Sequence, residues 1–340
     1  METRQLTTSN KGAFVISLDF ELYWGVLDKF ELNARKSYFL NTREKAIPSM
    51  LSLFQTYGIE VTWATVGMLF CDGKDELEAS LPTSKPNYQA KNLSAYQYLQ
   101  NHNVGKSEED DPFHFAPSII KAIAQVPGQE IATHTFSHYY CLESGQQPVD
   151  FYEDLMAAKK AGGRLGFELK SLVFPRNQYN ESYVQICEQA GIEVVRGNEN
   201  AWIWKPDSRS SEGKRKRIVR LADSYFNLYG HNAYTQMELQ NGAVLNAQAS
   251  RFLRPYQASF KSLESQKIDR ILKDIEYAAR RHACYHLWWH PHNFGYHTER
   301  NLDNLKRILD CFAIQREATG MQSLNMAHLK GWIYKSQKND

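Results

Sequence analysis

The sequence AFVISLDFE runs from Ala13 to Glu21. Its first six residues form a short apolar run of the kind that makes a buried β-strand. Because side chains two positions apart in a strand share a face, Asp19 and Glu21 point the same way. Two carboxylates held that close need a cation or a proton nearby. The stretch therefore predicts a buried strand that ends in a functional acid pair or, alternatively, in solvated acids paired with lysine or arginine.

Strand and helix signals alternate along the rest of the chain. An amphipathic stretch from Thr42 to Tyr57 stops at Gly58, a typical helix terminator, and a strand at 60–66 follows. Further helices are predicted at 117–124, 150–161, 182–190, 268–281 and 298–318, and further strands at 130–133, 170–174, 193–196, 284–289 and 321–325. Repeats of this length favour parallel strands wrapped by helices, so we expect an α/β fold.

Two polar segments interrupt this alternation. Residues 71–115 contain the acidic run Glu108–Asp111, and residues 198–248 contain the basic run Lys214–Arg217. Long loops within a compact domain usually serve as lids or binding loops. We find no repeat and no linker, so we expect a single domain over residues 1–340, with a core at about 13–330 and these two segments as insertions.

The overall composition excludes several classes of protein. Hydrophobic residues make up 42% of the 340 residues, enough for a large core, and the net charge of +2 provides no field for nucleic acid. No apolar run reaches the 18 residues of a membrane span, and Met1 to Gly12 lack the apolar centre of a secretory signal. Five cysteines, without C-x-x-C spacing, are expected to be reduced thiols. We therefore expect a cytoplasmic location.

Two histidines follow the strand predicted at 130–133. His134 and His138 are four residues apart, a spacing that lets both rings bind one ion in a helix or a tight loop. The metalloprotease motif with this spacing has a glutamate beside the first histidine, where this chain has Thr135. The general base must then come from elsewhere. We expect Glu21, His134 and His138 to form an open three-ligand site for a divalent metal, zinc above all, with Asp19 as the base.

A third histidine ends a strand near the C-terminus. The aromatic-rich run Cys284–Trp289 precedes His290, and Pro291 follows. A histidine at such a strand end can serve as the general acid for a leaving amine. His286 lies inside the strand, where we expect a satisfied or surface histidine.

These motifs together resemble the polysaccharide deacetylase family, also called carbohydrate esterase family four. They occur in the family's order at Leu18–Glu21, His134–His138, Phe174–Asn177 and Trp289–Pro291. The resemblance implies a distorted (β/α) barrel and, beside the roles above, that Arg176 orients Asp19. Two motifs depart from the common pattern: the acids are spaced as D-x-E instead of adjacent, and Pro175 precedes Arg176. The aspartate that steers the late histidine has no clear equivalent; Glu199 and Asp223 are candidates.

The resemblance implies hydrolysis of the N-acyl amide, acetyl or formyl, of an amino sugar or glycan intermediate. A cytoplasmic location favours a biosynthetic intermediate carried on a nucleotide or lipid diphosphate, which the basic run Lys214–Arg217 could contact. Two alternatives remain open. One is an allantoinase-like hydrolase of small amides on the same metal site, and the other is a carbohydrate-binding module without turnover.

Overall fold

The computed structural model describes residues 11–208, 213–239 and 242–335. Most of the polar N-terminal segment, residues 1–10, and small parts of the second predicted insertion lie outside these ranges. Strand β1 (Ala13–Phe20) is buried along its whole length, as its apolar run predicts. It pairs in parallel with β2 (Val61–Thr65) on one side and with β8 (Cys284–Trp289) on the other. The carboxyl ends of these three central strands therefore meet at one edge of the sheet.

All nine strands of the described residues join one parallel sheet. Its order is β6-β5-β4-β3-β2-β1-β8-β7, and β9 pairs with the first residues of β1. The remaining strands are β3 (Gln129–Thr133), β4 (Ser171–Val173), β5 (Val194–Arg196), β6 (Leu245–Asn246), β7 (Arg251–Phe252) and β9 (Gln322–Leu324). The sheet curls into the distorted (β/α) barrel that the sequence predicts.

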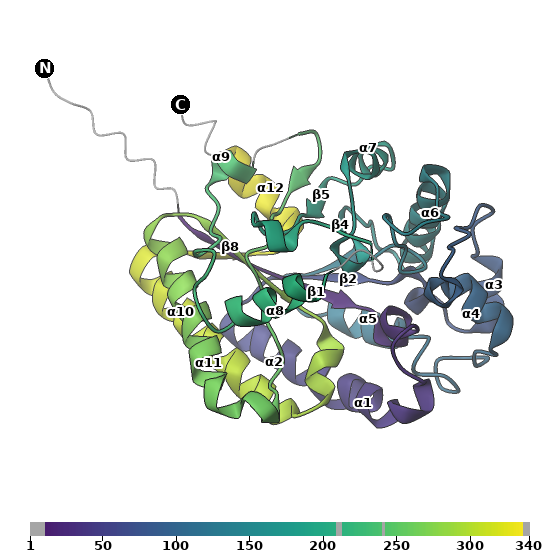
Figure 1. Cartoon of the computed structure of the whole chain (residues 1–340), viewed down its shortest axis with the longest axis horizontal. Coiled ribbons are helices and arrows are strands. Elements are labelled where there is room, and N and C mark those ends of the chain that lie inside the picture. Colours follow the sequence, from purple (N-terminus) through teal and green to yellow (C-terminus); the bar gives the residue numbers. More distant parts are fainter. Residues whose placement is uncertain (1–10, 209–212, 240–241, 336–340) are drawn as a thin grey trace, which may run out of the picture.

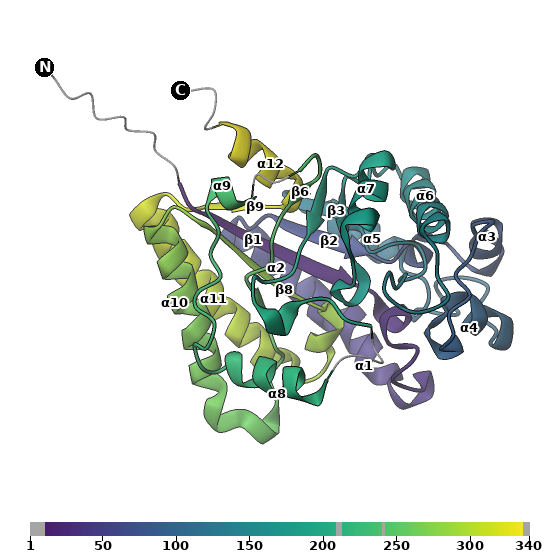
Figure 2. The same cartoon turned by 45° about the horizontal axis from the view of Figure 1, so that its top comes forward.

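Helices cover both faces of the sheet (Figure 1). Helices α2, α10 and α11 pack together on one side of β1, while α6 and α7 lie toward the other end of the sheet. Figure 2 shows the same layers, with α3 and α4 at the edge far from α10. The helices are α1 (Lys36–Asn41), α2 (Ile47–Tyr57), α3 (Lys74–Ala79), α4 (Ala95–Asn101), α5 (Pro117–Ala124), α6 (Pro148–Arg164), α7 (Glu181–Gln189), α8 (Lys214–Asp223), α9 (Gln236–Leu239), α10 (Glu264–Arg280), α11 (Thr298–Thr319) and α12 (Met326–Lys335).

Two helix boundaries show what local sequence can and cannot predict. Helix α2 ends where expected, because Gly58 adopts the left-handed conformation (φ 61°) that terminates a helix. Helix α6 instead runs through Gly162 and Gly163, at which we predicted its end. A Cβ at Gly162 would lie 2.9 Å from Leu169, so this glycine lets the following segment pack closely against a continuing helix.

The two polar segments are not simple insertions. Residues 71–115 contain α3 and α4, and residues 198–248 contain α8 and α9. The second segment also supplies β6, which pairs in parallel with β5 and so forms part of the sheet. A two-residue strand leaves too short a pattern to be recognised in sequence, and the prediction of a loop there was wrong. No helix of the described residues is both long and apolar enough to span a bilayer.

Candidate active site

The centre of the site is Glu21, the residue directly after β1. Its side chain is buried, and one of its oxygens, Oε1, lies 3.1 Å from Nε2 of His134 and 3.1 Å from Nε2 of His138. His134 follows β3 immediately, so the ends of two parallel strands bring the three residues together. Their ligand atoms lie within 4.8 Å of one another. This is the trio that the sequence predicts as metal ligands.

The second nitrogen of each imidazole has a hydrogen-bond partner, and this partner defines the tautomer of His134. Nδ1 of His134 lies 2.8 Å from the carbonyl oxygen of Val173, which can only accept, so Nδ1 carries the proton and Nε2 presents a lone pair to Glu21. Nδ1 of His138 lies 3.0 Å from the hydroxyl of Tyr140. Burial lowers the pKa of His138 to about 4, which favours the neutral, metal-binding ring. Lone pairs and a carboxylate oxygen that converge in a buried place fit a divalent cation.

The turn from His134 to His138 has an unusual backbone. Thr135 and His138 both adopt positive φ values, 63° and 59°. A buried carboxylate on α6, Asp154, stabilises the turn by accepting the backbone N–H groups of Phe136 (2.6 Å) and Ser137 (3.2 Å). Sequence reasoning missed Asp154, because its partners lie 17 or more residues away and no local spacing marks it.

Asp19 is held by an arginine that the sequence analysis did not select. Arg196, fully buried at the end of β5, donates Nη1 to Oδ1 of Asp19 (2.6 Å) and Nη2 to Oδ2 (2.8 Å). Its guanidinium also stacks over Trp288, 4.2 Å from the ring centroid. Burial would raise the pKa of Asp19, but the charge and hydrogen bonds of Arg196, together with His134 and His290, outweigh burial and keep the pKa below its usual value. A charged residue at the end of a predicted apolar strand was the available signal for Arg196.

The expectation that Arg176 orients Asp19 is wrong. Arg176 lies in the short turn after β4 with a left-handed backbone (φ 53°), and its Nη2 donates to both oxygens of Asp28, at 2.7 and 2.6 Å. Both oxygens of Asp19 are already occupied by Arg196, which explains why no second arginine is needed there. The neighbouring residue, Asn177, does reach this group, because its Oδ1 accepts from Arg196 at 3.0 Å.

A buried chain of hydrogen bonds links Arg196 to Ser17 and His286. Its Nη1 also donates to Oγ of Ser17 at 3.0 Å, and Ser17 Oγ lies 2.8 Å from Nε2 of His286. The other nitrogen of His286, Nδ1, donates to the carbonyl of Ala247 at 2.9 Å. Nε2 must then accept from the serine hydroxyl, and burial lowers the pKa of His286 to about 3, so the ring is neutral. His286 is the satisfied histidine that the sequence favours.

His290 faces both carboxylates from the end of β8. Its Nε2 lies 3.5 Å from Oε1 of Glu21 and 3.8 Å from Oδ2 of Asp19. Burial alone would lower the pKa of His290, but the two carboxylates raise it above its usual value. At the other ring nitrogen the neighbour is Asn293, whose Nδ2 lies 3.5 Å from Nδ1. The protonated form that a general acid needs is thus favoured.

Neither acid proposed to steer His290 reaches it. Asp223 instead pairs with Arg251 at 3.2 Å and with Arg270 at 3.3 Å. Glu199 is buried, and burial raises its pKa to about 7. His292, which no motif marked in the sequence, also lies near this group, with its Nδ1 4.0 Å from Oε2 of Glu21.

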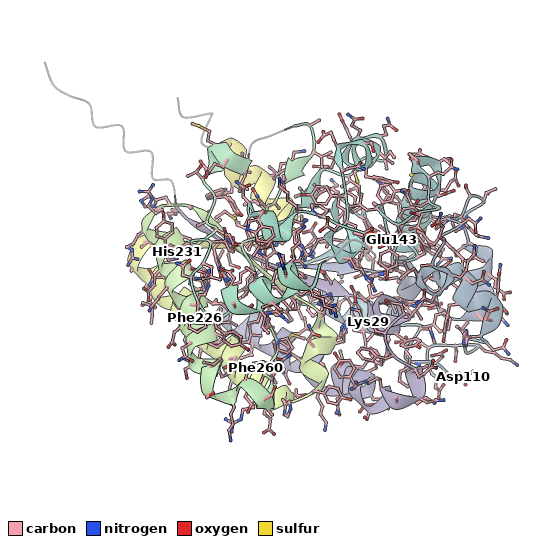
Figure 3. The ribbon with its side chains drawn as sticks, in the orientation of Figure 1. Lys29, Asp110, Glu143, Phe226, His231 and Phe260 are labelled. Carbon is pink, nitrogen blue, oxygen red and sulfur yellow. The ribbon has the colours of Figure 1, made fainter. Side chains whose placement is uncertain are left out.

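These groups open into a cavity of about 460 Å³. Asp19, Glu21, His138 and His290 line it, together with Arg176 and a set of aromatic side chains. Residues that follow β1 also contribute, among them Lys29, which Figure 3 shows near the middle of the view. Within the described chain the lining residues include none from 71–115 or 198–248.

Comparison with known proteins supports the reading of the motifs. A family model described as polysaccharide deacetylase matches residues 38–195. No curated protein matches the chain. A structure from Mycobacterium smegmatis named as a polysaccharide deacetylase has 13% identity and a TM-score of 0.59, covering 97% of this chain and 92% of that one.

Two further structures have the same fold. One, from Pseudomonas aeruginosa PAO1, is also named as a polysaccharide deacetylase, and the other is the allantoinase PuuE. Each has 10% identity and a TM-score of 0.53, and each alignment covers 96% of this chain and 91% of the other. At such identities the three structures show a shared fold only. The evidence from sequence is the family-model match and the order of the motifs along the chain. Residues 38–195 thus match the polysaccharide deacetylase family, and the chain has the fold of structures named as polysaccharide deacetylases.

Proposed function

We propose that this chain is a metal-dependent hydrolase of the polysaccharide deacetylase family, and that it removes the N-acyl group, acetyl or formyl, from an amino sugar. The observation that carries the proposal is the convergence of two imidazole Nε2 atoms on one buried carboxylate oxygen, each at 3.1 Å. Two nitrogens and one carboxylate oxygen are the ligand set of an open catalytic zinc site. Zinc is therefore the ion that we propose.

Glu21, His134 and His138 would hold the ion. When bound there, a divalent ion polarises the acyl carbonyl and lowers the pKa of water toward 7. The chain's own residues do the rest of the proton chemistry. Arg196 keeps Asp19 ionised and fixed, so that Asp19 can take a proton from the attacking water.

The leaving group also needs a proton, because an amine departs poorly as an anion. His290 lies within 4 Å of both carboxylates, which favour its protonated form. From that place it can give the proton to the departing sugar nitrogen. Because Asp19 sits beside His290, the same pair can exchange protons between turnovers.

A location in the cytoplasm belongs to the same proposal. All five cysteines are buried and unpaired, which suits a reducing compartment. There the acyl amino sugar would be a biosynthetic intermediate, including one linked to a nucleotide or lipid diphosphate, and not a finished polymer. A cavity of about 460 Å³ lies in the range of sites that enclose a small ligand.

The decisive experiment combines metal analysis with product release. Wild-type protein supplemented with zinc is expected to retain about one ion per chain and to release acetate or formate from N-acyl amino sugars. The His134→Ala variant should lose both properties, while Lys36→Gln, an exposed substitution that touches no ligand, should lose neither.

A silent carbohydrate-binding protein would retain the ion without releasing acid. Allantoin belongs in the same screen, because the allantoinase PuuE has the same fold. Turnover of allantoin with none on acylated sugars would replace the proposal with the small-amide alternative.

A further inference from the structure

The segment that contains α8 exposes several large apolar side chains. Of the eleven large apolar side chains that are exposed in the described chain, four lie between residues 202 and 228. Their exposed fractions are 49% at Trp202, 66% at Ile218, 55% at Phe226 and 51% at Leu228. A cluster of this kind on a protein surface is typical of a site that contacts another protein or a membrane.

Hydrogen bonds connect the parts of this segment. The backbone N–H of Phe226 donates to the carbonyl of Ala222 at 2.9 Å, so a helical turn continues past α8, and the N–H of Leu228 donates to the carbonyl of Phe226 at 2.9 Å. Nε1 of Trp202 donates to the hydroxyl of Tyr229 at 2.8 Å, which joins Trp202 to the same end of α8. Figure 3 shows Phe226 on the near side of the molecule, where α8 lies in Figure 1.

The side of α8 that faces the protein is held by polar contacts. Nε of Arg220 donates to the carbonyl of Ile203 at 2.7 Å. Asp223, the last residue of α8, pairs with Arg251 at 3.2 Å and with Arg270 at 3.3 Å. These contacts fix α8 in place without using the exposed apolar side chains.

Exposed cations lie on the same helix as Ile218. Lys214, Arg215 and Arg217 are exposed, and within the described chain none of the three forms an ion pair. The carboxylates among the described residues 202–208 and 213–230 are Asp207, which pairs with Lys216, and the buried Asp223. The exposed surface is therefore both apolar and positively charged. We name it the α8 surface, and it consists of Trp202, Lys214, Arg215, Arg217, Ile218, Phe226 and Leu228.

We propose that the α8 surface docks on an anionic lipid bilayer. Lysine and arginine attract negatively charged headgroups, while aliphatic and aromatic side chains enter the boundary between headgroups and acyl chains. A nucleic acid would also attract the cations, but its phosphates offer no apolar environment to Ile218 and Leu228. The combination of charge and apolar area thus fits lipid. Docking itself does not depend on the proposed function.

The α8 surface lies next to the cavity. Arg251, the partner of Asp223, immediately precedes Phe252, which lines the cavity. Docking therefore holds the cavity near the headgroups, where a lipid-linked acyl amino sugar is presented. This consequence rests on the proposed function, and among the intermediates named there it selects the one linked to a lipid diphosphate.

The test measures binding of the full-length protein to vesicles by flotation. Vesicles of phosphatidylcholine alone are compared with vesicles in which about a third of the lipid is phosphatidylglycerol. Binding is expected on the anionic vesicles only, and it should weaken as salt screens the charges. No binding to the anionic vesicles at low salt would overturn the proposal.

A triple variant tests the cations of the α8 surface. Lys214→Gln/Arg215→Gln/Arg217→Gln should lower the affinity for anionic vesicles about a hundredfold, because each cation near an anionic surface contributes roughly a factor of five.

The matched control removes the same net charge elsewhere. It is Lys45→Gln/Lys121→Gln/Lys160→Gln, three exposed positions outside the α8 surface, and it should bind the vesicles like the wild type. Equal losses in the two triple variants would mean that binding follows net charge alone, and the α8 surface would then be refuted.

Phe226→Ser/Leu228→Ser tests the apolar part without changing the charge. This variant should lower the vesicle affinity several-fold and leave the binding of a single-stranded oligonucleotide unchanged. An unchanged vesicle affinity would overturn the proposal. Tighter binding to the oligonucleotide than to the vesicles would assign the surface to nucleic acid and overturn it as well.

Turnover separates this proposal from the proposed function. The His134→Ala variant, which is expected to lose the ion, should dock like the wild type. The triple variant of the α8 surface should turn over a lipid-linked acyl amino sugar in vesicles more slowly and soluble N-acetylglucosamine at the rate of the wild type. Docking without turnover of any acyl amino sugar would support the α8 surface and refute the hydrolase, and turnover without docking would do the reverse.

Discussion

At the scale of single residues, Asp19 and Glu21 have different surroundings although they are two positions apart. Both oxygens of Asp19 are bonded by Arg196, whereas one oxygen of Glu21 faces two imidazole nitrogens. The first environment keeps a carboxylate charged and fixed, and the second is that of a metal ligand. These different surroundings are the reason why we propose Asp19 as the base and Glu21 as the ligand.

The two roles lead to opposite responses to substitution. Asp19→Asn should leave the zinc content near that of the wild type while lowering kcat by about 10²–10⁴-fold, since an amide cannot accept the proton. Glu21→Gln should instead weaken zinc binding, because it replaces a charged ligand by a neutral one. Elemental analysis and steady-state kinetics on the same preparations check both. The reverse pattern would show that the two roles are exchanged.

The buried ion pair of Arg196 and Asp19 is expected to matter for stability. Arg196→Met leaves the Asp19 carboxylate buried without its partner, a change that costs about 3–5 kcal/mol. Most of the loss should be restored in the double variant Arg196→Met/Asp19→Asn, which removes the buried charge. Urea unfolding of Arg196→Met, Asp19→Asn and the double variant measures this coupling. Additive effects would mean that the pair is not coupled in the folded protein.

At the scale of elements, short turns after the strands place the ligands. The turn Leu22–Val26 follows β1 directly and packs Gly25 against the Glu21 side chain, so closely that a Cβ at Gly25 would overlap the carboxylate. The turn after β3 is held to α6 by Asp154. Neither turn has a strong local signal, and both depend on elements far away in the sequence.

Gly25→Ala tests the first of these turns. The added methyl group must displace the Glu21 carboxylate, so we expect zinc affinity to fall at least tenfold and activity with it. Gly163→Ala is the matched control, because a Cβ there would meet nothing within 4 Å. Metal titration of both variants gives the comparison. Normal zinc affinity in Gly25→Ala would show that the carboxylate tolerates a different position.

At the scale of the whole molecule, the proposed ion links strands β1 and β3. Because the ligands converge only in the folded chain, an ion bound there stabilises the native state by mass action, about 2.7 kcal/mol at a free zinc concentration one hundred times Kd. Zinc should therefore raise Tm in wild type and not in His134→Ala or His138→Ala. Thermal melts with and without a chelator check this. An equal rise in all three proteins would place the stabilising ion elsewhere.

The sequence by itself determined the strand β1, the alternation of strands and helices, and the pairs Asp19/Glu21 and His134/His138. These features are local: a run of apolar side chains, a period or a spacing shows them without knowledge of the rest of the chain. Strand β8, Cys284–Trp289, was predicted at its observed bounds for the same reason.

Only the tertiary structure decided which partner each polar side chain has. Arg196 reaches Asp19 across 177 positions and Asp154 holds a turn 17 or more positions away, distances at which no sequence pattern operates. Arg176 matched the expected motif by position yet turned to Asp28, because a left-handed backbone and an occupied Asp19 directed it there. Buried polar groups take whichever complementary partner the packing brings within reach, and packing is a property of the whole fold.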